Sequence, residues 1–147
     1  MIILDITGIE LKLRHDGGRP MVFDPVRKSW FVLTPEEHLR QYVLRVLIDK
    51  MGYPASLVSV EKMIDVAGMD RRFDIIVYGR DHTPWMLVEC KRPDVPITQA
   101  TLHQLLAYQN VVRSRYWLLT NGPQAFCADA ADVADIQWLT SLPAYPF

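Results

Sequence analysis

Alternating apolar and polar residues near the start of the chain indicate extended structure. Residues 9–14 alternate with the period of two that a half-buried strand requires, and Asp16-Gly17-Gly18 follows as a turn. A second extended segment covers residues 28–33 after Asp24-Pro25. We therefore predict a β-rich N-terminal arm over residues 1–33.

The pattern changes to helical spacing at Thr34. Thr34 is a favourable N-cap, Pro35 suits the first helical position, and Glu37 stands where a capping box places its acid. The predicted helix ends near Gly52. Its core-facing stripe is predicted to contain Leu39, Tyr42, Val43, Leu44, Val46, Leu47 and Ile48.

Short apolar runs and a second helical pattern fill the rest of the chain. The predicted elements are strands at 57–66, 72–78 and 85–91, a helix at 98–114, a strand at 116–120 and its hairpin partner at 124–128. The tail, 129–147, is less regular, with an edge strand predicted at 136–139 and loose termination at Pro143 and Pro146. The order is typical of an α/β domain with a mixed central sheet, an N-terminal arm (1–33), a core (34–128) and a tail.

Composition limits the functional classes. A chain of 147 residues with 22% charged side chains is expected to form one globular domain with its own core. No apolar run is long enough to span a membrane, and the start lacks the basic residues of a signal peptide. Cys90 and Cys127 lack the spacing of metal ligands, so a reduced, cytoplasmic protein is expected. The net charge of −1 predicts weak non-specific affinity for nucleic acid without excluding a local basic surface.

Candidate chemistry lies at Asp74, Glu89 and Lys91. Asp74 stands just inside one predicted strand, and Glu89 and Lys91 end the next on one face. A turn over residues 79–84 makes the two strands a hairpin, which would bring both acids and the lysine together. Two acids in one place favour a divalent cation. A solvated ion pair at a strand end is the alternative interpretation.

The spacing Asp74, then Glu89-Cys90-Lys91, resembles the signature of the PD-(D/E)xK nuclease superfamily, and so does the predicted order α-β-β-β-α-β. The residues before the acid, Arg71-Arg72-Phe73, depart from that pattern. The resemblance implies Mg²⁺-dependent phosphodiester hydrolysis, with Mn²⁺ as a substitute. It implies that Asp74, Glu89 and the Cys90 carbonyl hold the metal and that Lys91 positions the attacking water.

Further residues fit the same resemblance. The superfamily often adds a third acid at the start of the first helix, and Glu36, expected to point inward, is the first candidate, with Glu37 as the substitute. Gln104 and Tyr108 share a helix face and resemble the Gln-x-x-x-Tyr motif of RecB-like nucleases; a polar face with a half-buried tyrosine is the alternative. The cations predicted to contact nucleic acid are Arg71, Arg72 and Arg92.

A longer resemblance runs from about residue 22 to 128. The segments that carry it are Phe23–Lys28, Leu33–Gln41, Gly52–Pro54, Glu61-Lys62, Arg72–Tyr78, Val88–Pro93 and Leu119–Gly122. They are similar to small stand-alone bacterial proteins that resemble the N-terminal nuclease domain of type I restriction enzyme R subunits. This resemblance implies an endonuclease fold acting on DNA, with separate motor or specificity subunits as partners.

The sequence contains no Gly-x-x-x-x-Gly-Lys-Ser/Thr loop, so ATP hydrolysis or translocation by this segment alone is not expected. A non-catalytic DNA-binding or complex-forming module that retains the nuclease fold is the alternative function. Sequence preference, DNA versus RNA, activity in isolation and oligomeric state are left open by the sequence.

Overall fold

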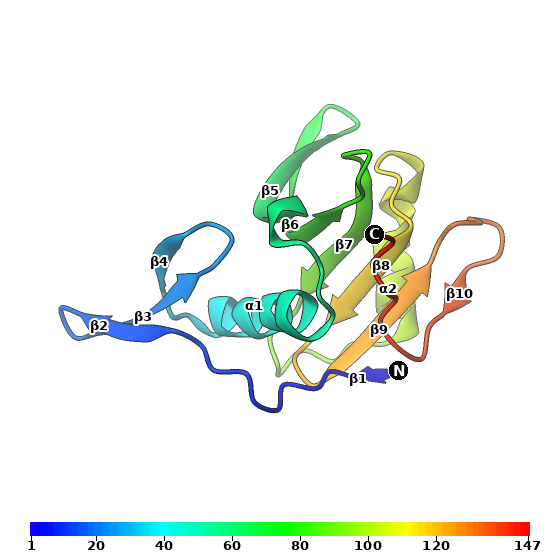
Figure 1. Cartoon of the computed structure of the whole chain (residues 1–147). Helices are drawn as coiled ribbons and strands as arrows, with labels where there is room; N and C mark the ends of the chain where they lie inside the picture. Colours follow the sequence, from blue (N-terminus) through cyan, green and yellow to red (C-terminus); the bar gives the residue numbers. More distant parts are fainter.

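A mixed central sheet with a helix on each face forms the body of the protein in the computed structural model, which covers residues 1–147 (Figure 1). The core elements follow in the order α1 (Pro35–Arg45), β5 (Val58–Val66), β6 (Met69–Tyr78), β7 (Pro84–Cys90), α2 (Gln99–Leu105) and β8 (Tyr116–Thr120). This is the predicted α-β-β-β-α-β order. The sheet continues through β9 (Gln124–Asp129) to β1 (Ile2–Ile3), and β10 (Gln137–Trp138) also pairs with β9. Only β7 and β8 run parallel. No helix is long and apolar enough to cross a membrane.

Helix α1 begins where the sequence predicts. The Thr34 side chain accepts a hydrogen bond from the Glu37 N–H at 3.1 Å, and Pro35 occupies the first position. The predicted reciprocal bond of a capping box is not formed, because the Thr34 N–H donates to the Val32 carbonyl. Beyond Arg45 the helix continues as a short π-helix, Val46–Lys50, and Gly52 then adopts the left-handed conformation that ends it.

Two apolar layers cover the sheet. One joins Leu44 of α1 and Leu47 of the π-helix that follows it to Ile75 and Val88 of the sheet. The other joins α2 and the 3₁₀-helix η3 (Leu106–Asn110) to the opposite face, where Trp117 is fully buried. The α1 side and the α2 side of the sheet are therefore distinct surfaces.

The N-terminal arm is more divided than predicted. Strand β1 joins the central sheet, whereas β2 (Leu13–Asp16), β3 (Arg19–Asp24) and β4 (Ser29–Val32) form a separate three-stranded antiparallel sheet beside the start of α1 (Figure 1). The alternating segment 9–14 becomes a strand only from Leu13. We call β2, β3 and β4 the arm sheet.

The second helix and the tail differ from the prediction. Helix α2 ends at Leu105 instead of Ser114 and is followed by the 3₁₀-helix η3. Beyond η3 the buried side chain of Gln109 bonds to the backbone of Ser114, where the prediction expected helical hydrogen bonds. The tail is anchored rather than loose. Tyr145 is buried, donates to the Tyr78 carbonyl at 2.9 Å and packs its ring against Trp85.

Candidate active site

The candidate site lies at the C-terminal end of β7, where its pairing with β6 stops. Ile75 pairs with Val88, and one step further the Cys90 N–H donates to Asp74 Oδ2 at 2.8 Å. On the other side, the Lys91 N–H donates to the Thr120 carbonyl of β8 at 2.8 Å. Adjacent strand ends thus place Asp74, Glu89 and Lys91 in one neighbourhood.

Their side chains do not all enter the same space. Glu89 and Lys91 line a pocket on the α2 side. Asp74 instead accepts hydrogen bonds from Arg40, which belongs to α1. The predicted convergence of the three side chains is therefore confirmed only in part: Glu89 and Lys91 share a pocket, and Asp74 points to α1.

A change of phase in the β5–β6 hairpin explains the direction of Asp74. Ile75 packs on the α1 side and Phe73 on the α2 side, although strict alternation would put both on one face. The partner strand shows the same switch between Val60 and Ile64. Between them Glu61 has a φ of 54°, the left-handed conformation that non-glycine residues seldom adopt. This distortion turns Glu61 and Asp74 toward α1.

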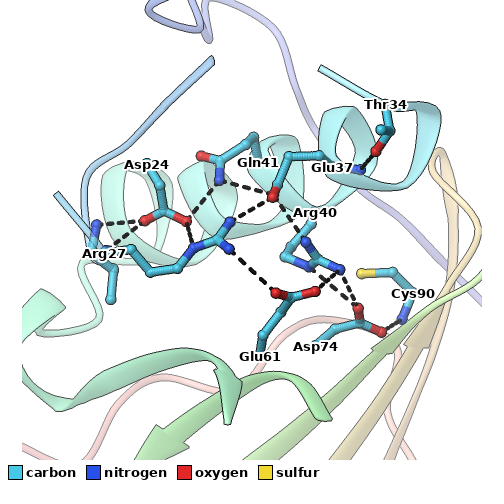
Figure 2. Close-up of polar contacts among 10 residues, drawn as sticks. Asp24, Arg27, Thr34, Glu37, Arg40, Gln41, Glu61, Asp74 and Cys90 are labelled. Atoms are coloured by element: carbon cyan, nitrogen blue, oxygen red, sulfur yellow. Dashed lines mark hydrogen bonds and ion pairs between the residues drawn. The ribbon is translucent and has the colours of Figure 1, made fainter. Parts of the chain in front are cut away.

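Arg40 is the centre of the resulting polar cluster (Figure 2). Its guanidinium lies 3.0 Å from Glu37 Oε2, 3.1 Å from Glu61 Oε1 and 3.0 Å from Asp74 Oδ1. The Arg40 side chain is only 9% exposed, so these charges interact with little screening. Despite the opposing effect of burial, the Glu37 and Asp74 carboxylates raise the pKa of Arg40.

The cluster extends to the arm sheet through Arg27. Arg27 pairs with Asp24 at 2.8 Å, with Glu37 at 2.6 Å and with Glu61 at 3.4 Å (Figure 2). Asp24 is fully buried at the end of β3 and also accepts from Gln41 of α1. Burial opposes ionisation of Asp24, but hydrogen bonds from Arg27 and Gln41 lower its pKa. A continuous chain of polar contacts therefore connects the arm sheet to Asp74.

Of the two acids that open α1, the structure brings the substitute toward the site. Glu37 is buried and bonded to both Arg27 and Arg40. Glu36 is exposed, so the inward direction predicted for it is wrong. Glu36 is seven residues before Val43, a spacing that predicted a place on the buried face. The buried face of α1 is instead centred on other positions and includes Gln41.

The α2-side pocket has a volume of about 230 Å³, and five of the predicted residues line it: Arg71, Glu89, Lys91, Gln104 and Tyr108. The guanidinium of Arg71 lies 4.4 Å from the centre of the Tyr108 ring, and its Nη2 lies 3.6 Å from Glu89 Oε2. Gln104 is exposed at the end of α2. We call this space the Glu89 pocket.

Glu89 is electrostatically unusual. Burial, followed by the nearby Asp74 carboxylate, raises its pKa to about 7, against the opposing effect of Arg71 and Lys91. One of its oxygens, Oε1, is buried and has no hydrogen-bond partner. A carboxylate with an orphan oxygen and a raised pKa is typical of a functional site.

The remaining predicted residues lie outside the lining of the Glu89 pocket. Arg72 is exposed on β6, and Arg92 is exposed and pairs with Asp94 at 3.4 Å. The Cys90 side chain packs on the α1 side, where burial raises its pKa well above the usual value. Arg40, which pairs with Asp74, and Glu61, which pairs with Arg40, were not predicted as site residues.

Comparison with known proteins places this geometry in a family. The family model for the type I restriction enzyme R protein N terminus matches residues 35–143, from the first turn of α1 into the tail. The chain belongs to this family. No curated protein matches the chain.

A solved structure has a similar fold. It is a fragment assigned as an HsdR subunit of a type I restriction enzyme from Vibrio vulnificus YJ016, with a TM-score of 0.56 and 20% sequence identity over 76% of this chain. The chain spans only 24% of that fragment. At this identity the likeness concerns the fold.

This R protein N-terminal domain offers a limited set of donors for a metal. No group of three or more His, Cys, Asp or Glu side chains is arranged to hold a metal ion. Mg²⁺, however, is commonly held by one or two carboxylates with waters in the other positions. Glu89 Oε1, which has no hydrogen-bond partner, is an oxygen ligand of the kind that Mg²⁺ prefers. The Asp74 carboxylate lies close enough to Glu89 to raise its pKa. The Glu89 and Asp74 carboxylates are therefore chemically suitable ligands for Mg²⁺. In the structure the Asp74 carboxylate is paired with the positive charge of Arg40.

Proposed function

We propose that this domain hydrolyses phosphodiester bonds in DNA with the help of Mg²⁺, at the Glu89 pocket. The observation that carries the proposal is the buried Glu89 carboxylate, whose Oε1 has no hydrogen-bond partner, in one pocket with Lys91 and Arg71. Membership of an R protein N-terminal family supports a role in a restriction system. Motor and specificity subunits are the partners that such a role would require.

The side chains in and around the pocket would have separate roles in phosphodiester hydrolysis. Lys91 would orient the attacking water and stabilise the negative charge that builds up on the phosphate. Arg71, held against Tyr108, would bind the phosphate on the same side of the pocket. Gln104 would steady Lys91 or the phosphate from the end of α2. Arg72 and Arg92, which are exposed outside the pocket lining, would contact neighbouring phosphates.

Asp74, Glu89 and the Cys90 carbonyl would hold the metal, with Glu37 acting on Asp74 through Arg40. A bound divalent cation would polarise the phosphate and lower the pKa of the nucleophilic water. Mn²⁺ would substitute for Mg²⁺. Arg40 pairs with Asp74 at 3.0 Å and fixes the position of its carboxylate, so it would act as a positioning residue.

One observation favours a second function. Asp74 already has partners at both oxygens, Arg40 at Oδ1 and the Cys90 N–H at Oδ2. A site in which the acid is satisfied without metal suits a non-catalytic module that binds DNA or partner subunits. The orphan Glu89 oxygen weighs against that function, because a purely structural site would have no reason to leave it unpaired.

A nuclease assay separates the two functions. Purified protein with Mg²⁺ or Mn²⁺ should nick or degrade plasmid or single-stranded DNA, and EDTA should stop it. Lys91→Ala should lose at least about a hundredfold in rate while keeping its fold, because Lys91 is exposed and a positioned proton-transfer group is worth that much. Lys62→Ala, also exposed and on β5, is the matched control. Equal rates in wild type and Lys91→Ala would refute the mechanism.

A further inference from the structure

The arm sheet has two chemically different faces. The strand registers pair Leu13 with Val22 and Val22 with Phe31 on the inner face, where Val22 is fully buried. The outer face holds the alternate residues. Those that matter here are Lys12, Arg14, Asp16, Arg19, Phe23 and Trp30.

Aromatic rings and cations are combined on this outer face. Phe23 and Trp30 pair across β3 and β4 with ring centres 5.4 Å apart. Lys12 Nζ lies 4.7 Å from the Phe23 ring centre, and the Arg14 guanidinium lies 4.1 Å from that of Trp30. Both rings are partly exposed, and all of β2 is exposed. Base stacking and phosphate contact both use groups of this kind.

The charge of the outer face differs from that of the chain. Three cations, Lys12, Arg14 and Arg19, face one acid, Asp16, which is paired with Arg14 at 2.8 Å. The whole chain has a net charge of −1, so the positive charge is local to this face. A polyanion that carries flat apolar groups complements this face.

We propose that the outer face of the arm sheet binds single-stranded DNA. Unpaired bases would stack on Trp30 and Phe23 while Lys12, Arg14 and Arg19 contact the phosphates. The choice of DNA rests on the proposed function; the choice of a single strand rests on the rings, because only unpaired bases expose a face for stacking.

The position of the arm sheet makes this surface useful to the Glu89 pocket. Asp24 at the end of β3 is tied through Arg27 to Glu37, and Glu37 through Arg40 to Asp74 (Figure 2). A strand held on the arm sheet would therefore sit at a fixed place relative to the site. The arm sheet would capture DNA, and the pocket would act on a neighbouring segment.

Fluorescence anisotropy with a labelled 20-nucleotide oligo-dT, in EDTA so that no cleavage occurs, tests the proposal. Trp30→Leu keeps an apolar side chain but removes the ring, and should weaken binding about tenfold, the scale of one base stacked on an aromatic side chain. The double variant Lys12→Gln with Arg14→Gln keeps both rings. It should lower the slope of log affinity against log salt by about 1.4, since each phosphate contact to a single strand is worth about 0.7.

Matched controls lie away from the arm sheet. Trp138→Leu alters a half-buried tryptophan on β10, and Lys62→Gln with Arg80→Gln removes two exposed cations. Neither should change oligo-dT binding appreciably. Duplex DNA should be insensitive to Trp30→Leu, because its bases are already stacked. Thermal melting of each variant checks the fold, and the double variant still tests phosphate contact if Trp30→Leu destabilises the arm sheet.

Several outcomes would overturn the proposal. Unchanged oligo-dT binding in Trp30→Leu would rule out base stacking on this ring. Equal losses of affinity for single-stranded and duplex DNA would rule it out as well. Wild-type binding of poly-glutamate as tight as that of oligo-dT, dependent on Lys12 and Arg14 but not on Trp30, would point to an acidic protein instead. Wild-type protein that binds oligo-dT in this Trp30-dependent way but cuts no DNA with Mg²⁺ or Mn²⁺ would count against the proposed function and not against the arm sheet.

Discussion

Replacing Glu89 by Gln should make the metal-free protein more stable at alkaline pH. Burial and the Asp74 carboxylate raise the pKa of Glu89 from 4.5 to about 7. An acid whose pKa is raised in the folded state stabilises that state only while it is protonated. Its contribution is fully present below about pH 4.5 and is lost as pH rises through 7. Glutamine stays neutral at every pH, so the variant escapes this loss.

The size of the effect follows from the two pKa values. A tenfold change in proton affinity is worth about 1.4 kcal/mol, so the gap between 4.5 and about 7 corresponds to roughly 3 kcal/mol. The Glu89 side chain is only 12% exposed, so solvent screening reduces this figure little. For a domain of this size the difference amounts to roughly 6–12 °C in Tm at pH 8, and to almost nothing near pH 4.5.

Urea unfolding followed by tryptophan fluorescence in EDTA, from pH 4.5 to 8.5, measures the difference directly. Glu36→Gln is the matched control, because Glu36 is exposed at the start of the same domain's first helix. Mg²⁺ should shrink the advantage of Glu89→Gln, since a cation favours the ionised carboxylate. A free energy difference between Glu89→Gln and wild type that is the same at pH 4.5 and 8.5 would refute the electrostatic account of this site.

The remaining predictions concern the neighbouring charges. Arg40→Met leaves the carboxylates around it without a partner and should lower the free energy of unfolding by about 3–5 kcal/mol. Arg45→Met, which breaks a partly exposed pair at 3.5 Å, should lower it by less than about 1 kcal/mol. Equal losses in urea melts would contradict the central role of Arg40. Millimolar Mn²⁺ should raise the Tm of wild type and of Asp65→Asn, an exposed carboxylate on β5, but not of Asp74→Asn. A shift that survives in Asp74→Asn would show that Asp74 holds no ion.

The parts of the fold that local chemistry decides could be predicted from the sequence. The Thr34-Pro35 start of α1 depends on a cap and a proline next to each other, and strand β8 depends on an unbroken apolar run. Helix α2 was predicted too long, because Gln109 bonds to Ser114 only once Gln109 is buried. No local pattern contains that information.

The candidate site likewise contains features that could be predicted from local sequence and features that depend on tertiary contacts. The neighbourhood of Asp74, Glu89 and Lys91 follows from strand pairing and could be predicted. The inward acid of α1 could not, since Glu36 and Glu37 are adjacent and only the docking of the helix selects one. The role of Arg40 depends on Glu61, whose left-handed backbone is invisible in the residue type. The choice between Glu36 and Glu37 and the role of Arg40 therefore depend on long-range contacts that residue spacing in the sequence does not specify.

Strand β9 has an outer edge that is shared between two distant parts of the chain. Ile2 pairs with Ala125, and Trp138 pairs with Ala128 on the same strand. Until both segments dock, β9 presents free N–H and C=O groups that can pair with another molecule. Shortening the chain at either end should therefore promote aggregation even though the Glu89 pocket is untouched. Soluble yield, more than activity, would be the first property to suffer in trimmed versions of this domain.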